Sequence, residues 1–198
     1  TTSAGYPNSR KVNLANTGDA LTARSNAVSS LGDKNVNYIR NSIKATVDAY
    51  DGTVSLYQWD EKDPVLATWS KAFPGIVKAK SEISPALLSH IRYPEDMFRV
   101  QRDILSAYHV KTADAFYGGQ DFWRVPLDPS TFGSNAGNQP PYYLTMQIPG
   151  QTKPTFSLST PFVPRGGREN LSALAVVNSD AGDDYGKITV LQLPRSTN

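Results

Sequence analysis

The order of the hydrophobic patterns along the chain restricts its fold more than any other feature. Apolar and polar residues alternate with period two in residues 36–59, follow helical spacing in the middle of the chain, and alternate again near its end. The later alternating segments are 142–148, 155–163, 171–177 and 187–193, each bounded by Pro, Gly or Asn. This segregation predicts an α+β fold: a mainly antiparallel sheet with an N-terminal β-hairpin, a central group of short helices and C-terminal strands. Pro161 predicts an edge or a bulge in its strand.

The first alternating segment predicts the hairpin. Asp51-Gly52 is a dipeptide that tolerates two positive φ angles, so we expect a two-residue turn there. Counting outward from that turn places Val47 opposite Leu56 on the buried side. The other face is aromatic without being apolar, and we take it as a candidate interaction face. It carries Lys44 opposite Trp59 and Thr46 opposite Tyr57. The alternative is that a helix or the arm 1–35 covers the aromatic side chains of this face as part of the core.

Proline near the start of each helical pattern predicts where the central helices begin. Asp63-Pro64 supplies an N-cap and an N1 proline for a helix that ends before Pro74-Gly75. Ser84-Pro85 repeats this start for a shorter helix, and Pro94 opens a third, longer one. One more short helical segment is expected between Thr112 and Gly119.

Composition excludes several classes of function. The chain has 20 Lys and Arg against 18 Asp and Glu, a net charge of +2, and only 19% charged residues, so nucleic acid is not expected as a partner. It has no cysteine, and its only histidines are His90 and His109, so we expect no cofactor. No apolar run approaches the ~20 residues of a membrane span. The start lacks Met and a signal-peptide pattern, which predicts that the chain is excised from something longer.

The N-terminal segment differs in composition from the rest of the chain. Residues 1–35 are rich in Ser, Thr, Asn, Ala and Gly, with few large apolar side chains. We expect an ordered arm over 1–35, packed on a single α+β domain that spans 36–198. A short helix that uses Thr17 as its N-cap is expected within the arm.

Several stretches of the sequence resemble an uncharacterised family of large multipass membrane proteins that is common in actinobacteria. The longest is Val36-Asn37-Tyr38-Ile39-Arg40-Asn41-Ser42-Ile43-Lys44-Ala45-Thr46-Val47-Asp48-Ala49-Tyr50-Asp51-Gly52. Others are Lys71-Ala72-Phe73-Pro74-Gly75, Arg92-Tyr93-Pro94-Glu95-Asp96, Asp121-Phe122-Trp123, Gln139-Pro140-Pro141-Tyr142-Tyr143, Phe162-Val163-Pro164-Arg165-Gly166 and Glu169-Asn170-Leu171. The segment 8–35 matches weakly, and Asn8 interrupts a run that reads Tyr-Pro-Tyr-Ser in the family.

The resemblance implies a cellular context and no reaction. In this family, membrane-spanning helices precede a large region outside the cytoplasm, and the chain is similar to part of that region. The implied location is the cell membrane of the parent protein, with this region outside the cytoplasm. The family has no established catalytic residues to carry over.

Two loops contain residue types that bind ions. Arg165 and Arg168 flank Gly166-Gly167, an arrangement that suits capture of a phosphate, a carboxylate or a lipid headgroup. The alternative is a solvated turn whose arginines pair with carboxylates such as Glu169. A second loop is a weak calcium candidate, because it lacks the glycine and the bidentate glutamate of a calcium loop. An acidic hairpin turn is the favoured explanation. The possible calcium ligands are Asn178, Asp180 and Asp184.

Three hypotheses about function follow. The first is a non-enzymatic module, outside the cytoplasm, that docks on the rest of its parent membrane protein or on another envelope protein. The second is a binding domain for an anionic envelope ligand, either a lipid headgroup or a cell-wall polymer, that uses Arg165 and Arg168. The third and least favoured is a hydrolase, which needs His90 or His109 to converge with a carboxylate.

Overall fold

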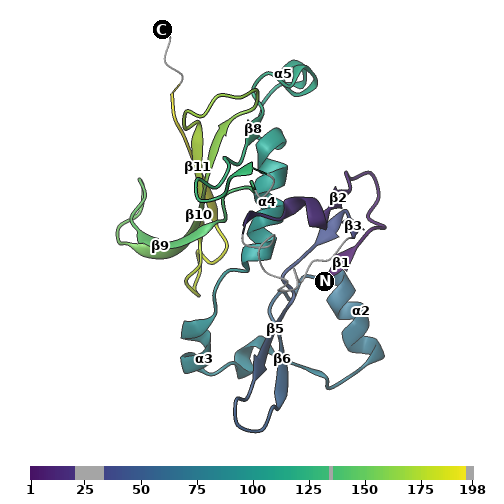
Figure 1. Cartoon of the computed structure of the whole chain (residues 1–198). Helices are drawn as coiled ribbons and strands as arrows, with labels where there is room; N and C mark the ends of the chain where they lie inside the picture. The colour runs from purple at the N-terminus through teal and green to yellow at the C-terminus, as the bar shows by residue number, and fades with distance from the viewer. Residues whose placement is uncertain (21–33, 134–135, 195–198) are drawn as a thin grey trace. The chain divides into compact units, whose positions relative to one another are not determined.

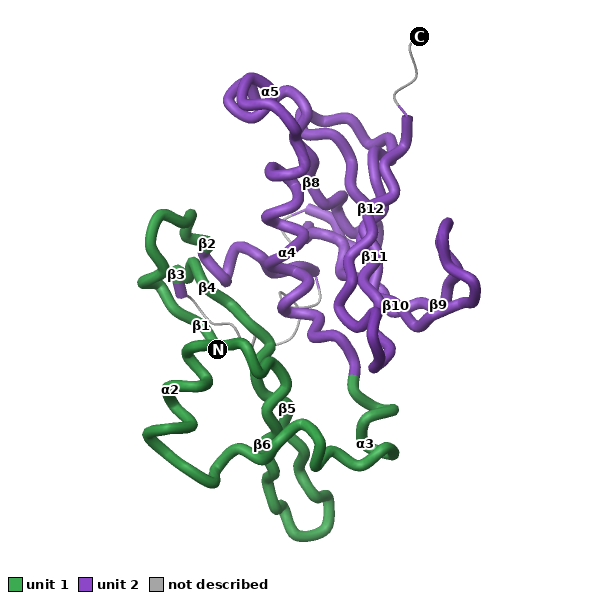
Figure 2. Tube along the Cα trace, turned by 180° about the vertical axis from the view of Figure 1, so that it is seen from behind, with its two compact units in different colours: residues 1–12, 35–91 green, residues 13–34, 92–198 purple. Residues whose placement is uncertain are grey.

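The computed structural model describes residues 1–20, 34–133 and 136–194, and it confirms the α+β fold class (Figure 1). Its contacts divide the chain into two compact units (Figure 2). Unit 1 contains residues 1–12 and 35–91, and unit 2 contains residues 13–34 and 92–198. The expected arm 1–35 is thus shared between the units. The helix expected after Thr17 falls mainly on residues 21–33, outside the described residues.

Unit 1 combines short ladders with two helices. Strand β1 (Thr2–Ser3) pairs antiparallel with β4 (Tyr38–Ile39), β5 (Ile43–Val47) pairs antiparallel with β6 (Val54–Gln58), and β7 (Val77–Lys78) lies parallel to β6. The other elements are β3 (Asn35–Val36), α2 (Pro64–Ala72), the 3-10 turn η2 (Lys80–Glu82) and α3 (Pro85–His90). Both helices begin at the predicted prolines, since Asp63 and Ser84 cap them through their side chains.

The hairpin confirms the predicted pair of strands, but the predicted register is wrong. Val47 pairs with Val54 and Lys44 pairs with Tyr57, a shift of two residues from the expected pairing. The cause is a longer loop. The N–H of Asp48 donates to the carbonyl of Thr53, which is the last hydrogen bond between the strands, and four residues form the loop between these two. Only Gly52 in that loop has a positive φ, of 74°, so the two-residue turn does not form.

Asp63 organises unit 1 as a buried carboxylate. Its Oδ2 accepts hydrogen bonds from the hydroxyls of Thr1, at 2.5 Å, and Ser42. Its Oδ1 accepts from Tyr38 Oη at 2.6 Å and from the backbone N–H of Val65 at 3.0 Å. Burial raises the pKa of Asp63, but these hydrogen bonds outweigh it and hold the pKa well below its ordinary value. One side chain therefore joins the start of α2 to three other segments.

Unit 2 is built around a mainly antiparallel sheet. The strand order is β12 (Ile188–Gln192), β11 (Ala173–Asn178), β10 (Thr155–Pro164) and β8 (Trp123–Arg124), while β9 (Tyr142–Met146) also pairs with β10. The remaining elements are the 3-10 turn η1 (Leu14–Thr17), α4 (Glu95–Tyr108) and α5 (Ala113–Gly118). Strand β2 (Val12–Asn13) is where the chain passes from unit 1 to unit 2.

Pro161 lies where β10 changes partners. On one side β10 pairs continuously with β11. On the other, residues up to Ser159 pair with β9, and pairing with β8 starts at Val163. The Phe162 carbonyl accepts from Ser172 on the β11 side, so the neighbouring Pro161 faces the gap, where no N–H is required. This local edge fits the expectation drawn from the proline.

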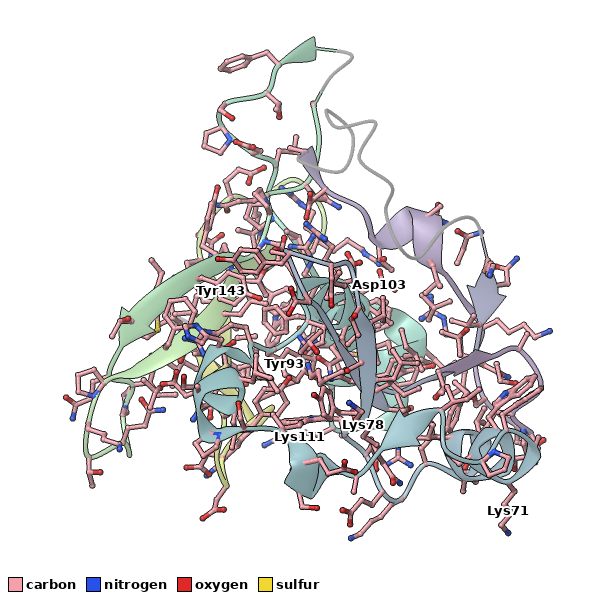
Figure 3. The ribbon with its side chains drawn as sticks, turned by 90° about the horizontal axis from the view of Figure 1, so that it is seen from below. Lys71, Lys78, Tyr93, Asp103, Lys111 and Tyr143 are labelled. Atoms are coloured by element: carbon pink, nitrogen blue, oxygen red, sulfur yellow. The ribbon has the colours of Figure 1, made fainter. Side chains whose placement is uncertain are left out.

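Helix α4 packs against the sheet to form the core of unit 2. The core cluster is Tyr93, Phe98, Trp123, Leu158, Phe162, Ala173, Ala175 and Val177. Tyr143 donates a hydrogen bond to the carbonyl of Tyr93 at 2.6 Å, and Figure 3 labels both side chains. The strand β9 is thereby tied to the segment that leads into α4.

We predict that Asp63→Asn lowers the free energy of unfolding by about 2 kcal/mol at pH 7, because an amide cannot accept all of these hydrogen bonds. The folded-state pKa of Asp63 is depressed, so its stabilisation is present above its unfolded pKa of ~3.9 and is lost as the pH falls below that value. The difference between wild type and variant should therefore shrink from pH 5 toward pH 2 in urea titrations. Glu61→Gln, at an exposed position, is the control. If the difference in free energy of unfolding between wild type and Asp63→Asn stays constant with pH, Asp63 does not have a depressed pKa in the folded protein.

Candidate functional site

The predicted anion-binding loop follows β10 and contains two glycines with positive φ. Gly166 has φ 97° and Gly167 has φ 85°, so both require a residue without a side chain. Arg165 extends over the ring of Phe122 at 5.1 Å. Arg168 is exposed, and its carbonyl accepts from Arg124 at 3.4 Å. The two arginines therefore have different surroundings.

Arg165 lines a pocket of about 400 Å³ within unit 2, and Arg168 does not. Three further arginines line the same pocket: Arg99 and Arg102 from α4, and Arg124 from β8. Trp123, Val125 and Leu127 supply apolar walls. Among the lining residues the only acidic one is Asp103, labelled in Figure 3. The fold thus gathers four guanidinium groups from three separate parts of the sequence.

Arg99 is buried in a cluster of carboxylates. Its Nε donates to Asp19 at 2.5 Å, its Nη1 donates to Asp96 at 2.6 Å, and its Nη2 donates to Glu95. Burial lowers the pKa of Arg99, but the three carboxylates outweigh it and raise the pKa above its ordinary value. Arg99 is therefore fully committed to structural ion pairs.

Arg102 is more deeply buried than Arg99 but has fewer hydrogen-bond partners. Arg102 is only 2% exposed, and its Nη1 donates to the Gln139 carbonyl at 2.8 Å. Its Nη2 lies 3.6 Å from Asp19, beyond hydrogen-bond distance, and has no hydrogen-bond partner among the described residues. Burial lowers the pKa of Arg102 to about 10, so the group is still charged at neutral pH. A buried N–H without an acceptor is costly.

The acidic partners of these arginines lie outside the pocket lining. Asp19, Glu95 and Asp96 hold Arg99, and Glu169 pairs with Arg124, but none of the four lines the pocket. Four of the five charged residues that line the pocket are therefore arginines, and their acidic partners are not among the lining residues. Such a lining can bind an anion through charge-assisted hydrogen bonds.

The predicted interaction face on the hairpin is largely covered by lysines. Tyr57 is 7% exposed and has Lys78 Nζ over its ring at 5.7 Å. Trp59 lies beneath Lys44 Nζ at 5.3 Å and Lys80 Nζ at 4.3 Å. Burial lowers the pKa of Lys44 to about 8. Thr46 pairs with Ser55 and not with Tyr57. Figure 3 labels Lys78.

In the calcium candidate, the side chains hold their own loop. Asn178 Oδ1 accepts from the N–H of Asp180 at 3.0 Å, and Asp180 Oδ2 accepts from the N–H of Phe156 at 2.9 Å. Asp184 forms an ion pair with Lys187 at 3.2 Å. No group of three or more acidic, His or Cys residues that could hold a metal occurs within the described ranges.

The two histidines have separate surroundings. His109 stacks on Trp123 with ring centroids 3.4 Å apart. Its Nδ1 lies 2.8 Å from the Leu105 carbonyl and its Nε2 lies 2.9 Å from the Asp121 carbonyl, so whichever ring nitrogen carries the proton has a backbone carbonyl as its acceptor. His90 is exposed at the end of α3. These contacts of His109 are structural, and none of them is with the carboxylate that the hydrolase hypothesis requires.

Sequence analysis missed Arg99, Arg102, Arg124 and Asp19 as site residues. A signal for Arg102 was present, because it lies four residues after the buried Phe98 and three before Leu105, on the apolar stripe of α4. A charged residue on such a stripe indicates a buried ion pair. Its partner Asp19 lies too far away in the sequence to be inferred.

We predict that Asp19→Asn lowers the free energy of unfolding by about 3 kcal/mol, because it leaves Arg102 buried without its countercharge. Asp184→Asn, which breaks an exposed ion pair in the same unit, should cost less than ~1 kcal/mol. Urea titrations followed by near-ultraviolet circular dichroism measure both. Equal losses in the free energy of unfolding for Asp19→Asn and Asp184→Asn would contradict a structural role for the ion pairs of Asp19 with Arg99 and Arg102.

Comparison with known proteins identifies relatives along the whole chain. The UPF0182 proteins of Thermobifida fusca, Streptomyces coelicolor and Bifidobacterium longum are 60%, 53% and 49% identical over 100% of this chain. The chain spans only 19%, 20% and 20% of those relatives, about a fifth of their length. No solved structure matches it. Within the described residues no helix is long and apolar enough to cross a membrane. A family model matches residues 1–198, and the chain belongs to the uncharacterised protein family UPF0182.

Proposed function

We propose that this chain is a non-enzymatic docking module, outside the cytoplasm, of a larger integral membrane protein, and that another segment of the same protein packs on it. The observation that carries the proposal is an apolar surface on unit 1. Trp69 and Phe73 stack with ring centroids 5.6 Å apart and are 57% and 52% exposed. Ile76, on the following turn, is 57% exposed. We call Trp69, Phe73 and Ile76 the α2 surface.

The α2 surface continues an apolar stripe that is only partly covered. Leu66, one turn earlier on the stripe, is 1% exposed, while Trp69 and Phe73 are open. An amphipathic helix is stable when its apolar stripe is covered along its length. Among the described residues, nothing covers the C-terminal end of this stripe.

The length of the relatives favours a segment of the same protein as the cover. The chain corresponds to about a fifth of each relative, so most of a full-length protein lies outside it. A segment joined covalently to the module has a high effective concentration at its surface, which favours it over a separate protein. The aromatic side chains offer a large contact area at low entropic cost.

The location outside the cytoplasm can be tested through Tyr50. Tyr50 is fully exposed at the tip of the hairpin, and the chain has no cysteine. We predict that Tyr50→Cys in the full-length protein reacts with a membrane-impermeant maleimide in intact cells, at least tenfold more than the unsubstituted protein. Reaction only after the membrane is permeabilised would place the module in the cytoplasm.

Docking on the α2 surface can be tested by photo-crosslinking. A benzoylphenylalanine at position 73 of the full-length protein should yield cross-linked peptides that join it to residues of the same polypeptide outside this chain, without a change in the protein's mass on a gel. Tyr117, which is 87% exposed in unit 2, is the control position and should give little product. Products of higher mass alone would indicate a separate envelope protein and reject the intramolecular arrangement. Equal yields at the two positions would reject the docking surface.

A further inference from the structure

We propose that the arginine-lined pocket of unit 2 binds the phosphate group of a small phosphate ester. This inference does not depend on docking at the α2 surface, because different residues in a different unit carry it. Three elements provide the donors: α4 provides Arg102, β8 provides Arg124, and the loop after β10 provides Arg165. We call these three residues the phosphate site.

Arg102 is the first observation that points to a ligand. It is 2% exposed, it lines the pocket, and its Nη2 has no hydrogen-bond partner among the described residues. The carboxylate nearest to Nη2, that of Asp19, is already the hydrogen-bond acceptor of Arg99 Nε. A buried guanidinium charge is weakly screened, so it exerts a strong field in its surroundings. An anion in the pocket would compensate that field.

The second observation is the arrangement of the other two arginines. The ion pair of Arg124 with Glu169 and the contact of Arg165 with Phe122 hold these side chains near the pocket that they line. Neither Glu169 nor Phe122 lines the pocket. Both guanidinium groups therefore keep donors for a ligand, since a guanidinium has five N–H groups and one carboxylate occupies at most two.

The geometry favours phosphate over carboxylate. A planar carboxylate is satisfied by one guanidinium fork, whereas a tetrahedral phosphate offers acceptor oxygens in several directions. Donors that arrive from three separate elements suit the tetrahedral group. The pocket volume of about 400 Å³ leaves room for an organic part, and Val125 and Leu127 provide apolar contact for it.

Asp103 limits the charge of the ligand. It is the one acidic lining residue among those described, and it lies next to Arg102 on α4. Its carboxylate repels a polyanion but accepts hydrogen bonds from hydroxyl or ammonium groups. The site is therefore expected to prefer a single phosphate group with a polar substituent, such as a glycerol phosphate, to a polyphosphate.

The test uses the 198-residue chain and two matched variants. Inorganic phosphate and glycerol 3-phosphate are titrated separately at constant ionic strength, set with sodium chloride, and binding is followed through the arginine Nε–H signals in nuclear magnetic resonance spectra. Arg165→Gln and Arg168→Gln each remove one charge from the same exposed loop, but only Arg165 lines the pocket. We expect Arg165→Gln to weaken binding by about tenfold, and Arg168→Gln by less than about twofold.

A third variant addresses the buried arginine. Arg102→Lys keeps the charge but removes the fork, so a folded variant should bind glycerol 3-phosphate about tenfold more weakly. The chemical-shift pattern of Arg102→Lys is compared with that of the wild type to check its fold. If Arg102→Lys does not fold, Arg165→Gln carries the test. Equal losses in Arg165→Gln and Arg168→Gln, or no response to either phosphate, would overturn the proposal.

The source of the phosphate is distinguished by vesicles. Flotation with vesicles of phosphatidylcholine and phosphatidylglycerol, competed by glycerol 3-phosphate and weakened by Arg165→Gln, would assign the site to a lipid headgroup. Binding of glycerol 3-phosphate without flotation would assign it to a free phosphate ester. Flotation that is insensitive to Arg165→Gln, with no binding of free phosphate, would contradict the phosphate site. None of these outcomes depends on cross-linking at Phe73, so the two proposals fail separately.

Discussion

The burial of two arginines on one helix is the constraint on which unit 2 depends. Arg99 and Arg102 are both buried on α4, and a guanidinium can leave water only if its charge and its N–H groups find partners. Asp19 contributes a carboxylate from the N-terminal part of the chain, and Glu95 and Asp96 contribute theirs from the first turn of α4. These two acidic residues also suit the positive end of the helix dipole. The N-terminal segment is thus held in unit 2 by charge as well as by the burial of Leu14 and Ala20.

This arrangement distributes the charges unevenly. Asp19 accepts a hydrogen bond from Arg99 but reaches Arg102 only at 3.6 Å, so the second arginine has the weaker partner. A structure under selection for stability alone gains little from such a group, because well-packed apolar residues of similar volume stabilise a core as well or better. The incomplete pairing of Arg102 is therefore more readily explained by a ligand than by stability. The same reasoning does not apply to Arg99, whose three carboxylates leave it no spare charge.

The features that could be predicted from the sequence are those that local chemistry determines. Asp63-Pro64, Ser84-Pro85 and Thr112 start helices because each cap acts within three residues of itself. The late strands were also placed within a few residues, because a half-buried strand shows its period directly. The hairpin register was not predictable in this way, since it depends on whether two or four residues form the turn. The phosphate site was missed except for Arg165, because its donors come from three elements and Arg102 is partnered by a residue more than 80 positions away.

Exposure at the α2 surface has a different origin from the incomplete pairing in the pocket. Single apolar side chains on a protein surface are ordinary, but Trp69 and Phe73 form a stacked pair that continues the buried stripe of α2 from Leu66. A nine-residue helix has little stability of its own, so its stripe must be covered for the helix to persist. In the part of the chain that the structure describes, Leu66 is covered, while Trp69 and Phe73 are exposed. The proposed docking would cover these exposed side chains of unit 1, whereas the described residues that line the arginine pocket all belong to unit 2.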